Sequence, residues 1–81
     1  MTRLTIYSRP GCHLCDEMKE VVHRVAASVP VVLEEIDISG DAELERLYGT
    51  EIPVLMADRK KVAKYRIGES ELLRVITGLR A

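Results

Sequence analysis

The stretch Ile6-Tyr7-Ser8-Arg9-Pro10-Gly11-Cys12-His13-Leu14-Cys15 decides the fold of this chain. It contains the only two cysteines, in C-x-x-C spacing, directly after a Pro-Gly break. Residues 4–7 have the pattern of a short strand, and an amphipathic helical pattern follows the second cysteine. A strand, a tight turn, a C-x-x-C pair and a helix in this order indicate a thiol–disulfide redox site.

The position of the cysteines at a helix start has a chemical consequence. Unpaired N–H groups and the helix dipole favour negative charge there, and a thiolate is the reactive form of cysteine. We therefore expect Cys12 to be the nucleophile, with a thiol pKa below the ordinary value of about 8.5. Cys15 follows one helical turn later on the same side. It is expected to be less exposed and to act as the resolving thiol.

Length and composition limit the fold and the partners. The 81 residues make one domain at most, residues 1–81, and a hydrophobic content of 47% is enough for a globular core. That core must be mainly aliphatic, because the chain has no Trp or Phe. A net charge of −1 argues against a nucleic-acid partner.

The chain has neither a secretory signal pattern nor a run of about 18 apolar residues, which a membrane helix needs. We therefore expect a soluble, cytoplasmic protein with no membrane partner. In a reducing cytoplasm, a lone C-x-x-C pair is more often catalytic or metal-binding than structural.

Hydrophobic periodicity predicts seven elements in the order β-α-β-α-β-β-α. The four expected strands cover residues 4–7, 31–38, 54–57 and 61–65. The three expected helices begin at Leu14, after the N-cap Asp41, and at Gly68; they end at Pro30, at the C-cap Gly49 and at Gly78. Acidic residues in the second strand indicate that it lies at a sheet edge. The first two strands are far enough apart for a parallel crossover, and the last two form a hairpin.

These segments resemble a glutaredoxin over almost the whole chain. The cysteine-bearing stretch resembles the glutaredoxin strand-loop-helix segment. Leu33-Glu34-Glu35-Ile36-Asp37-Ile38 is similar to the family's second strand, and Glu51-Ile52-Pro53-Val54-Leu55 resembles its Thr-Val-Pro segment. The resemblance implies an α/β thioredoxin fold, in which helices cover both faces of a four-stranded mixed sheet.

The resemblance also implies roles for Ile52 and Pro53 in substrate binding. It implies that the Ile52–Pro53 bond is cis and that Pro53 lies beside Cys12. Proline has no N–H, so the backbone of Ile52 would be open to pair with an extended peptide or with glutathione.

Three departures indicate a divergent, glutaredoxin-like branch. His13-Leu14 stands where glutaredoxins usually have Pro-Tyr, Glu51 replaces the Thr of Thr-Val-Pro, and Gly68 stands alone where the family often has two glycines. The two-glycine segment binds the γ-glutamyl end of glutathione in the family. Each change therefore weakens the expectation that glutathione is the partner.

Two further residues near the cysteines are candidates for substrate binding. A cationic His13 beside Cys12 would lower the pKa of the thiol, whereas the alternative is a side chain that points to solvent. Arg9, three residues before Cys12, could stabilise the thiolate or hold a substrate carboxylate; the alternative is an ordinary loop cation.

Three functions remain open at this point. The leading one is a monomeric thiol–disulfide oxidoreductase without bound cofactor or metal. It would reduce protein disulfides or glutathione mixed disulfides, with glutathione or a reductase as electron donor. The second is zinc or iron–sulfur binding in a dimer, because two cysteines do not complete a metal site. The third is a non-catalytic thioredoxin-fold interaction domain, against which the intact C-x-x-C argues.

Overall fold

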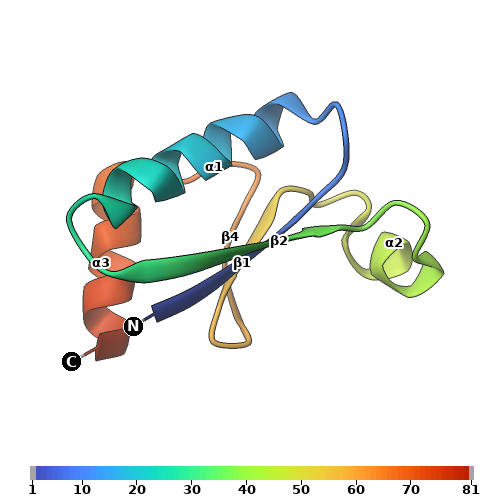
Figure 1. Ribbon diagram of the computed structural model, residues 1–81. Helices are drawn as coiled ribbons and strands as arrows, with labels where there is room; N and C mark the ends of the chain where they lie inside the picture. Colours follow the sequence, from blue (N-terminus) through green and yellow to red (C-terminus); the bar gives the residue numbers. More distant parts are fainter. Residues whose placement is uncertain (1, 81) are drawn as a thin grey trace.

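The backbone follows the predicted β-α-β-α-β-β-α order (Figure 1). The computed structural model describes residues 2–80, with side chains described for residues 2–78. Its elements are β1 (Thr2–Ser8), α1 (His13–Ala26), β2 (Val31–Asp37), α2 (Ala42–Tyr48), β3 (Val54–Ala57), β4 (Lys60–Lys64) and α3 (Glu69–Arg80).

The predicted helix ends are the least accurate part of the sequence analysis. α1 already ends at Ala26, before Pro30, and the predicted stop of α3 at Gly78 is wrong because the helix continues to Arg80. A Cβ at Gly78 would meet only open space, so no contact there requires a glycine. A glycine in an exposed helix costs only about 1 kcal/mol relative to alanine, which the rest of the helix can offset.

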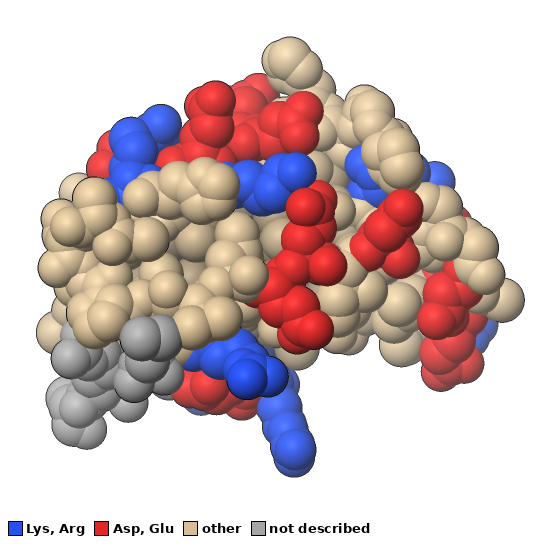
Figure 2. Space-filling view, viewed as in Figure 1, with Lys and Arg blue, Asp and Glu red and all other residues tan. Residues whose placement is uncertain are grey.

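The four strands form one mixed sheet in the order β2-β1-β3-β4. β1 and β2 run parallel, whereas β3 is antiparallel to both β1 and β4. β2 therefore lies at an edge, as its acidic residues predicted. Figure 2 shows acidic side chains over α1 and along this edge, with basic side chains between them.

One face of the sheet carries the hydrophobic core. Leu4 and Ile6 of β1 are fully buried there against α1 and α3. The core side chains are aliphatic or methionine, as the composition predicted: Leu4, Ile6, Met18, Val22, Val25, Leu55, Ala57, Ile67, Leu72 and Ile76. In Figure 1, α1 and α3 lie together, apart from α2.

The opposite face is covered at one end by α2. Tyr7 points to this face at the end of β1, and its ring stacks on Tyr48 of α2 with 4.4 Å between ring centroids. The side-chain oxygen of Asp41 accepts a hydrogen bond from the Leu44 N–H at 3.1 Å, which confirms the predicted N-cap of α2. The α/β fold with helices on both faces of a mixed sheet is thereby confirmed.

The turn of the β3–β4 hairpin has an unusual backbone. Asp58 and Arg59 connect the paired residues Ala57 and Lys60, and both have positive φ, 48° and 75°. Two consecutive residues of positive φ are typical of a type I′ turn, which usually contains Asn or Gly.

Within residues 2–80, no helix is both long enough and apolar enough to span a bilayer.

Candidate functional site

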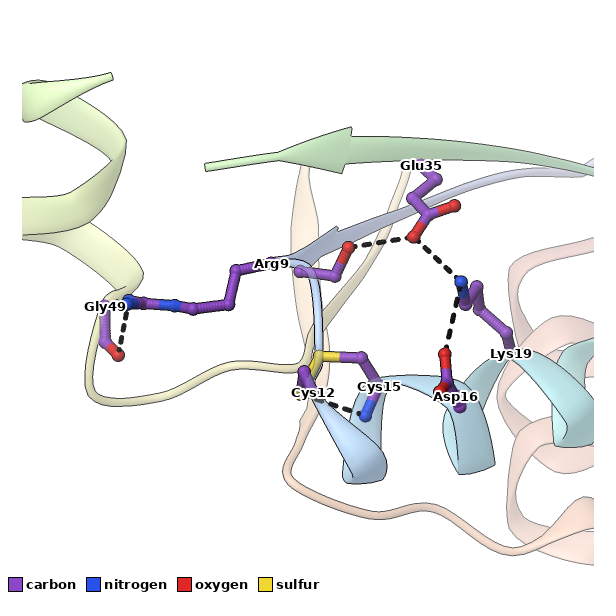
Figure 3. The surroundings of a disulfide bond; sticks show 8 residues. Arg9, Cys12, Cys15, Asp16, Lys19, Glu35 and Gly49 are labelled. Atoms are coloured by element: carbon purple, nitrogen blue, oxygen red, sulfur yellow. Dashed lines mark hydrogen bonds and ion pairs between the residues drawn. A yellow bond between two sulfur atoms is a disulfide. The ribbon is translucent and has the colours of Figure 1, made fainter. Parts of the chain in front are cut away.

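Cys12 and Cys15 are joined by a disulfide at the start of α1, with 5.2 Å between their Cα atoms (Figure 3). Cys12 is the N-cap residue, and its backbone is extended, with φ −86° and ψ 109°. Its Sγ accepts a hydrogen bond from the Cys15 N–H at 3.1 Å. The positive φ of Gly11, 76°, lets the chain turn tightly into the helix. Once the disulfide is reduced, this N–H and the helix dipole can stabilise a thiolate on Cys12.

The two sulfur-bearing side chains differ in exposure. Cys15 is 1% exposed and packs beneath the helix start, whereas Cys12 is only partly buried. A substrate can therefore approach the Cys12 side chain more easily than that of Cys15.

A second loop reaches the same end of the sheet. It comprises residues 49–53, here named the cis-proline loop, because the Ile52–Pro53 bond is cis as the resemblance implied. Val54 pairs with Tyr7, so Pro53 comes next to the end of β1. The chain leaves β1 there for residues 9–12, here named the cysteine loop. The end of the cis-proline loop and the start of the cysteine loop thus lie at the same end of two neighbouring strands.

His13 faces solvent in this structure. Its side chain is 92% exposed, and its Nε2 lies 3.9 Å from the Glu17 carboxylate one turn further along α1. This is the solvent-facing alternative considered from the sequence, and any influence of His13 on Cys12 would act through water-exposed space.

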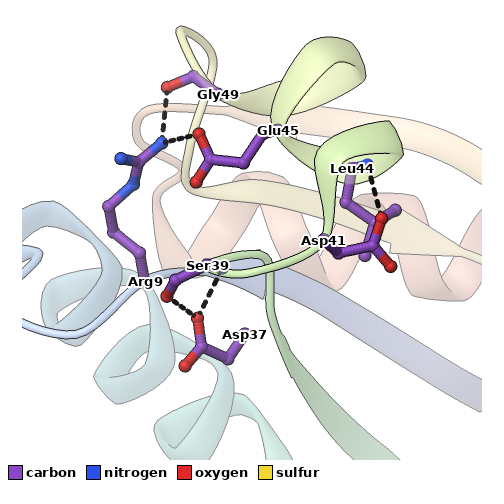
Figure 4. A network of polar contacts seen from close by, with 7 residues as sticks. All are labelled: Arg9, Asp37, Ser39, Asp41, Leu44, Glu45 and Gly49. Atoms are coloured by element: carbon purple, nitrogen blue, oxygen red, sulfur yellow. Dashed lines mark hydrogen bonds and ion pairs between the residues drawn. The ribbon is translucent and has the colours of Figure 1, made fainter.

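Arg9 points toward α2 (Figures 3 and 4). Its Nη2 donates to the Glu45 carboxylate at 3.2 Å and to the Gly49 carbonyl at 3.3 Å. Its Nε is buried without a hydrogen-bond partner. The guanidinium group therefore connects the cysteine loop to the end of α2 and to the first residue of the cis-proline loop.

A polar network beside Cys15 escaped the sequence analysis. Ser8 Oγ and Lys19 Nζ both donate to the Glu35 carboxylate, at 3.0 Å and 2.9 Å. The hydrogen bonds from Lys19 and Ser8 lower the pKa of Glu35, and the bond to Glu35 raises the pKa of Lys19. A cavity of about 320 Å³ opens here, and it is lined by Ser8, Arg9, Pro10, Gly11, Cys15, Asp16, Lys19, Glu35 and Asp37.

One feature of the sequence does point to this network. Glu34 and Glu35 are adjacent in β2, and neighbouring strand residues face opposite sides of a sheet. One carboxylate must therefore face the side that carries α1, where it needs a polar partner. Lys19 of α1 supplies that partner.

Within residues 2–80, no three His, Cys, Asp or Glu side chains come together in a way that could hold a metal ion.

The chain is similar to known proteins over nearly all of its length. Residues 3–77 match the family model described as "Glutaredoxin-like domain (DUF836)". A protein named "Glutaredoxin-like protein YDR286C homolog" from Dictyostelium discoideum is 36% identical over an aligned length of 77 residues; the match covers 85% of this chain and 69% of that protein.

Solved structures agree with the fold. Protein XcR50 from X. campestris is 29% identical with a TM-score of 0.79, covering 93% of this chain and 96% of that one. Protein Ne2328 from Nitrosomonas europaea is 33% identical with a TM-score of 0.80, covering 91% and 89%. A thioredoxin from Halobacterium salinarum is 25% identical with a TM-score of 0.63, covering 95% and 73%. The chain therefore belongs to the glutaredoxin-like domain family of the thioredoxin superfamily, with a C-x-x-C disulfide that fits a redox function.

Proposed function

We propose that this protein is a thiol–disulfide oxidoreductase in which Cys12 and Cys15 together pass two electrons to a disulfide. The observation that carries the proposal is the unequal placement of the two sulfurs. The Cys12 sulfur accepts an N–H hydrogen bond at a helix start and belongs to the more exposed cysteine, whereas Cys15 is 1% exposed beneath it.

In the first step, the Cys12 thiolate attacks one sulfur of a substrate disulfide. A bond forms between Cys12 and that sulfur, the substrate S–S bond breaks, and the other substrate sulfur leaves as a thiolate that takes up a proton. The product is a mixed disulfide between Cys12 and the substrate.

In the second step, Cys15 loses its proton and attacks the Cys12 sulfur. The mixed disulfide breaks, and the remaining half of the substrate leaves as a thiolate. The protein now holds the Cys12–Cys15 disulfide seen in this structure. The dithiol has been oxidised by two electrons, and the substrate disulfide has been reduced to two thiols.

Two thiols of an external donor must return these electrons. Either two glutathione molecules, which end as glutathione disulfide, or the dithiol of a reductase can supply them. This cycle suits a reducing compartment such as the cytoplasm, where the glutathione and thioredoxin systems keep thiols reduced.

Protein disulfides and glutathione mixed disulfides are the substrates that we propose. Ile52 supports this class, because neither its N–H nor its C=O has a hydrogen-bond partner within residues 2–80. An extended peptide or the peptide part of glutathione can pair with these two groups in the manner of an added strand.

The test is reduction of a small glutathione mixed disulfide, driven by reduced glutathione and a glutathione-recycling system. Turnover by the native protein that vanishes in Cys12→Ser would support both the chemistry and the nucleophile. If the native protein shows none, its activity on insulin disulfides with dithiothreitol distinguishes a protein-disulfide substrate from a chain that exchanges no disulfide. The proposal would be refuted if the native protein exchanged neither the glutathione mixed disulfide nor the insulin disulfides, or if turnover survived in Cys12→Ser.

A further inference from the structure

The cis-proline loop is held from one side by the cysteine loop. Arg9 lies three positions before Cys12, and its Nη2 donates to the carbonyl of Gly49, the first residue of the cis-proline loop. The same nitrogen donates to Glu45, which fixes the direction of the guanidinium group. Figure 4 shows one guanidinium nitrogen of Arg9 reaching both acceptors. A displacement of either loop would lengthen these bonds.

Tyr65 holds the loop from the other side, just after β4. Its hydroxyl donates to the Thr50 carbonyl at 3.3 Å, and its backbone N–H donates to the Pro53 carbonyl at 2.9 Å. One residue therefore binds both the second and the last residue of the cis-proline loop.

Tyr65 makes these bonds from an unfavourable backbone conformation. Its φ is 71°, and the Arg66 N–H donates to the Lys64 carbonyl at 2.8 Å across it. This is a γ-turn with positive φ at its centre, which is the rare and strained form. Non-glycine residues persist in such conformations mainly where surrounding contacts enforce them, often at functional sites. Tyr65 is also 41% exposed, so burial of apolar surface does not account for the conformation.

These bonds leave one residue of the loop open. The Gly49, Thr50 and Pro53 carbonyls are occupied, and the Glu51 N–H donates to the Tyr48 carbonyl at 2.8 Å. Among residues 49–53, only Ile52 lacks a partner for both backbone groups within the part of the chain that the structure describes. The loop is therefore fixed on either side of Ile52, the residue that we propose to pair with a substrate strand.

We propose that Arg9 and Tyr65 are positioning residues that hold the cis-proline loop at the correct distance from Cys12 for pairing of Ile52 with a peptide substrate. This rests on the proposed oxidoreductase function and refines it. Selectivity for disulfides that carry a peptide backbone depends on the hydrogen bonds that Arg9 and Tyr65 make to the loop, here named the two braces. Neither residue touches the exchanging sulfurs in this role.

The test compares two disulfides in single-turnover reactions of the fully reduced protein. One is the disulfide-linked dimer of a capped pentapeptide with a central cysteine, and the other is bis(2-hydroxyethyl) disulfide, which has no peptide backbone. The variants are Arg9→Met, Tyr65→Phe and the double variant. Arg46→Met is the matched control, because among the described side chains Arg46 pairs only with Glu43, on the surface of α2.

Each single variant should lower the ratio of the peptide rate constant to the hydroxyethyl rate constant by about three- to tenfold, the effect of one lost hydrogen bond. The double variant should lower the ratio further, Arg9→Lys should recover part of the loss, and Arg46→Met should leave it unchanged. The pH profile of Cys12 alkylation should not move.

Two kinetic results would overturn the proposal. One is an unchanged ratio in both single variants. The other is an equal slowing of both disulfides with a shifted alkylation profile, which would mean that Arg9 acts on the Cys12 thiolate instead. If the unsubstituted protein reduces neither disulfide, the proposed function itself fails. NMR order parameters of the Glu51 and Ile52 amides then test the braces alone, because both should fall in Arg9→Met and Tyr65→Phe, and unchanged values would refute the braces.

Discussion

The two cysteines differ in access and in hydrogen bonding although they share one helical turn. The Cys12 sulfur accepts the Cys15 N–H at the start of α1, whereas Cys15 packs beneath the turn. In the proposed reaction, exchange would begin at the sulfur that a substrate can reach, so the order of attack would follow from position and not from residue type.

Replacing Cys15 with serine should therefore stop the reaction at the mixed disulfide. Cys12 can still attack, but no second thiol is available to release the substrate. Intact-mass spectrometry without reductant should show a covalent adduct between Cys15→Ser and a disulfide-bonded protein substrate, and the Cys12→Ser variant should show none. Native turnover of protein disulfides by Cys15→Ser would rule out a resolving role.

Local sequence revealed the cysteines but not the partners of Arg9. Arg9 lies close to Cys12 in the chain, which suggested a role at the thiolate. Its guanidinium group instead reaches Glu45, 36 positions away. Such a contact depends on where α2 packs against the sheet, and no spacing rule within the cysteine stretch contains that information.

At the scale of elements, the β3–β4 hairpin contains a turn that its residues do not favour. Arg59 has a φ of 75°, in the region that favours glycine. A side chain in this conformation costs about 1–2 kcal/mol. Glycine avoids this cost, but part of the gain is lost because glycine gives up more conformational freedom on folding.

We expect Arg59→Gly to stabilise the protein by about 0.5–1 kcal/mol, measured as a higher urea midpoint. Lys60→Gly is the control, because Lys60 begins β4 and pairs with Ala57. A glycine there should destabilise the protein by roughly 0.5–1 kcal/mol. Equal effects of the two substitutions would contradict the role assigned to the turn.

The Lys19–Glu35 ion pair connects α1 to the β2 edge and gives stability a specific pH dependence. The pKa of Glu35 is lowered in the folded protein, first by the hydrogen bond from Lys19 and then by that from Ser8. A carboxyl with a lowered folded-state pKa stabilises the protein above its unfolded-state pKa, about 4.3, and this contribution is lost as the pH falls through the folded-state pKa.

Glu35→Gln should therefore be less stable than the native protein at pH 7, with the difference shrinking below about pH 4. Urea unfolding at a series of pH values measures this. Glu43→Gln removes an exposed ion pair within α2, and it should change stability little at any pH. A Glu35→Gln difference that stayed constant down to pH 2 would contradict the linkage.

Periodicity predicted which elements form better than where they end. The strand over 54–57 was predicted with its observed limits, because the Pro before it and the turn after it both restrict the backbone. Gly78 gave a false stop, since one glycine in a helix costs only about 1 kcal/mol, which the rest of the helix can offset.

At the scale of the whole molecule, one apolar layer between the sheet and two helices holds the ten buried side chains of the core cluster. Ile6 is fully buried in the central strand β1, inside this layer. The aliphatic nature of the core was predictable from composition, because the chain has no Phe or Trp. Which face of each strand it covers required the observed pairing.

Ile6→Ala should cost about 2–5 kcal/mol of unfolding free energy, a large part of what an 81-residue domain has, whereas Ile6→Val should cost about 0.5–1.5. Val32→Ala, at an exposed position of β2, should stay within about 0.5 kcal/mol of the native value. Urea unfolding followed by far-UV circular dichroism gives all three. A loss at Val32 equal to that at Ile6 would mean that the sheet is buried on both faces in solution.

The disulfide spans so few residues that it contributes little to holding the fold together. Cys12 and Cys15 are three positions apart, so their bond closes a very short loop of the chain. Neither cysteine belongs to the ten-residue core cluster. We therefore expect the sheet, the helices and their packing to stay in place when the bond is reduced. In the proposed reaction, the oxidised and reduced forms of this two-electron carrier would share one shape, so that a donor and an acceptor would recognise the same surface in turn.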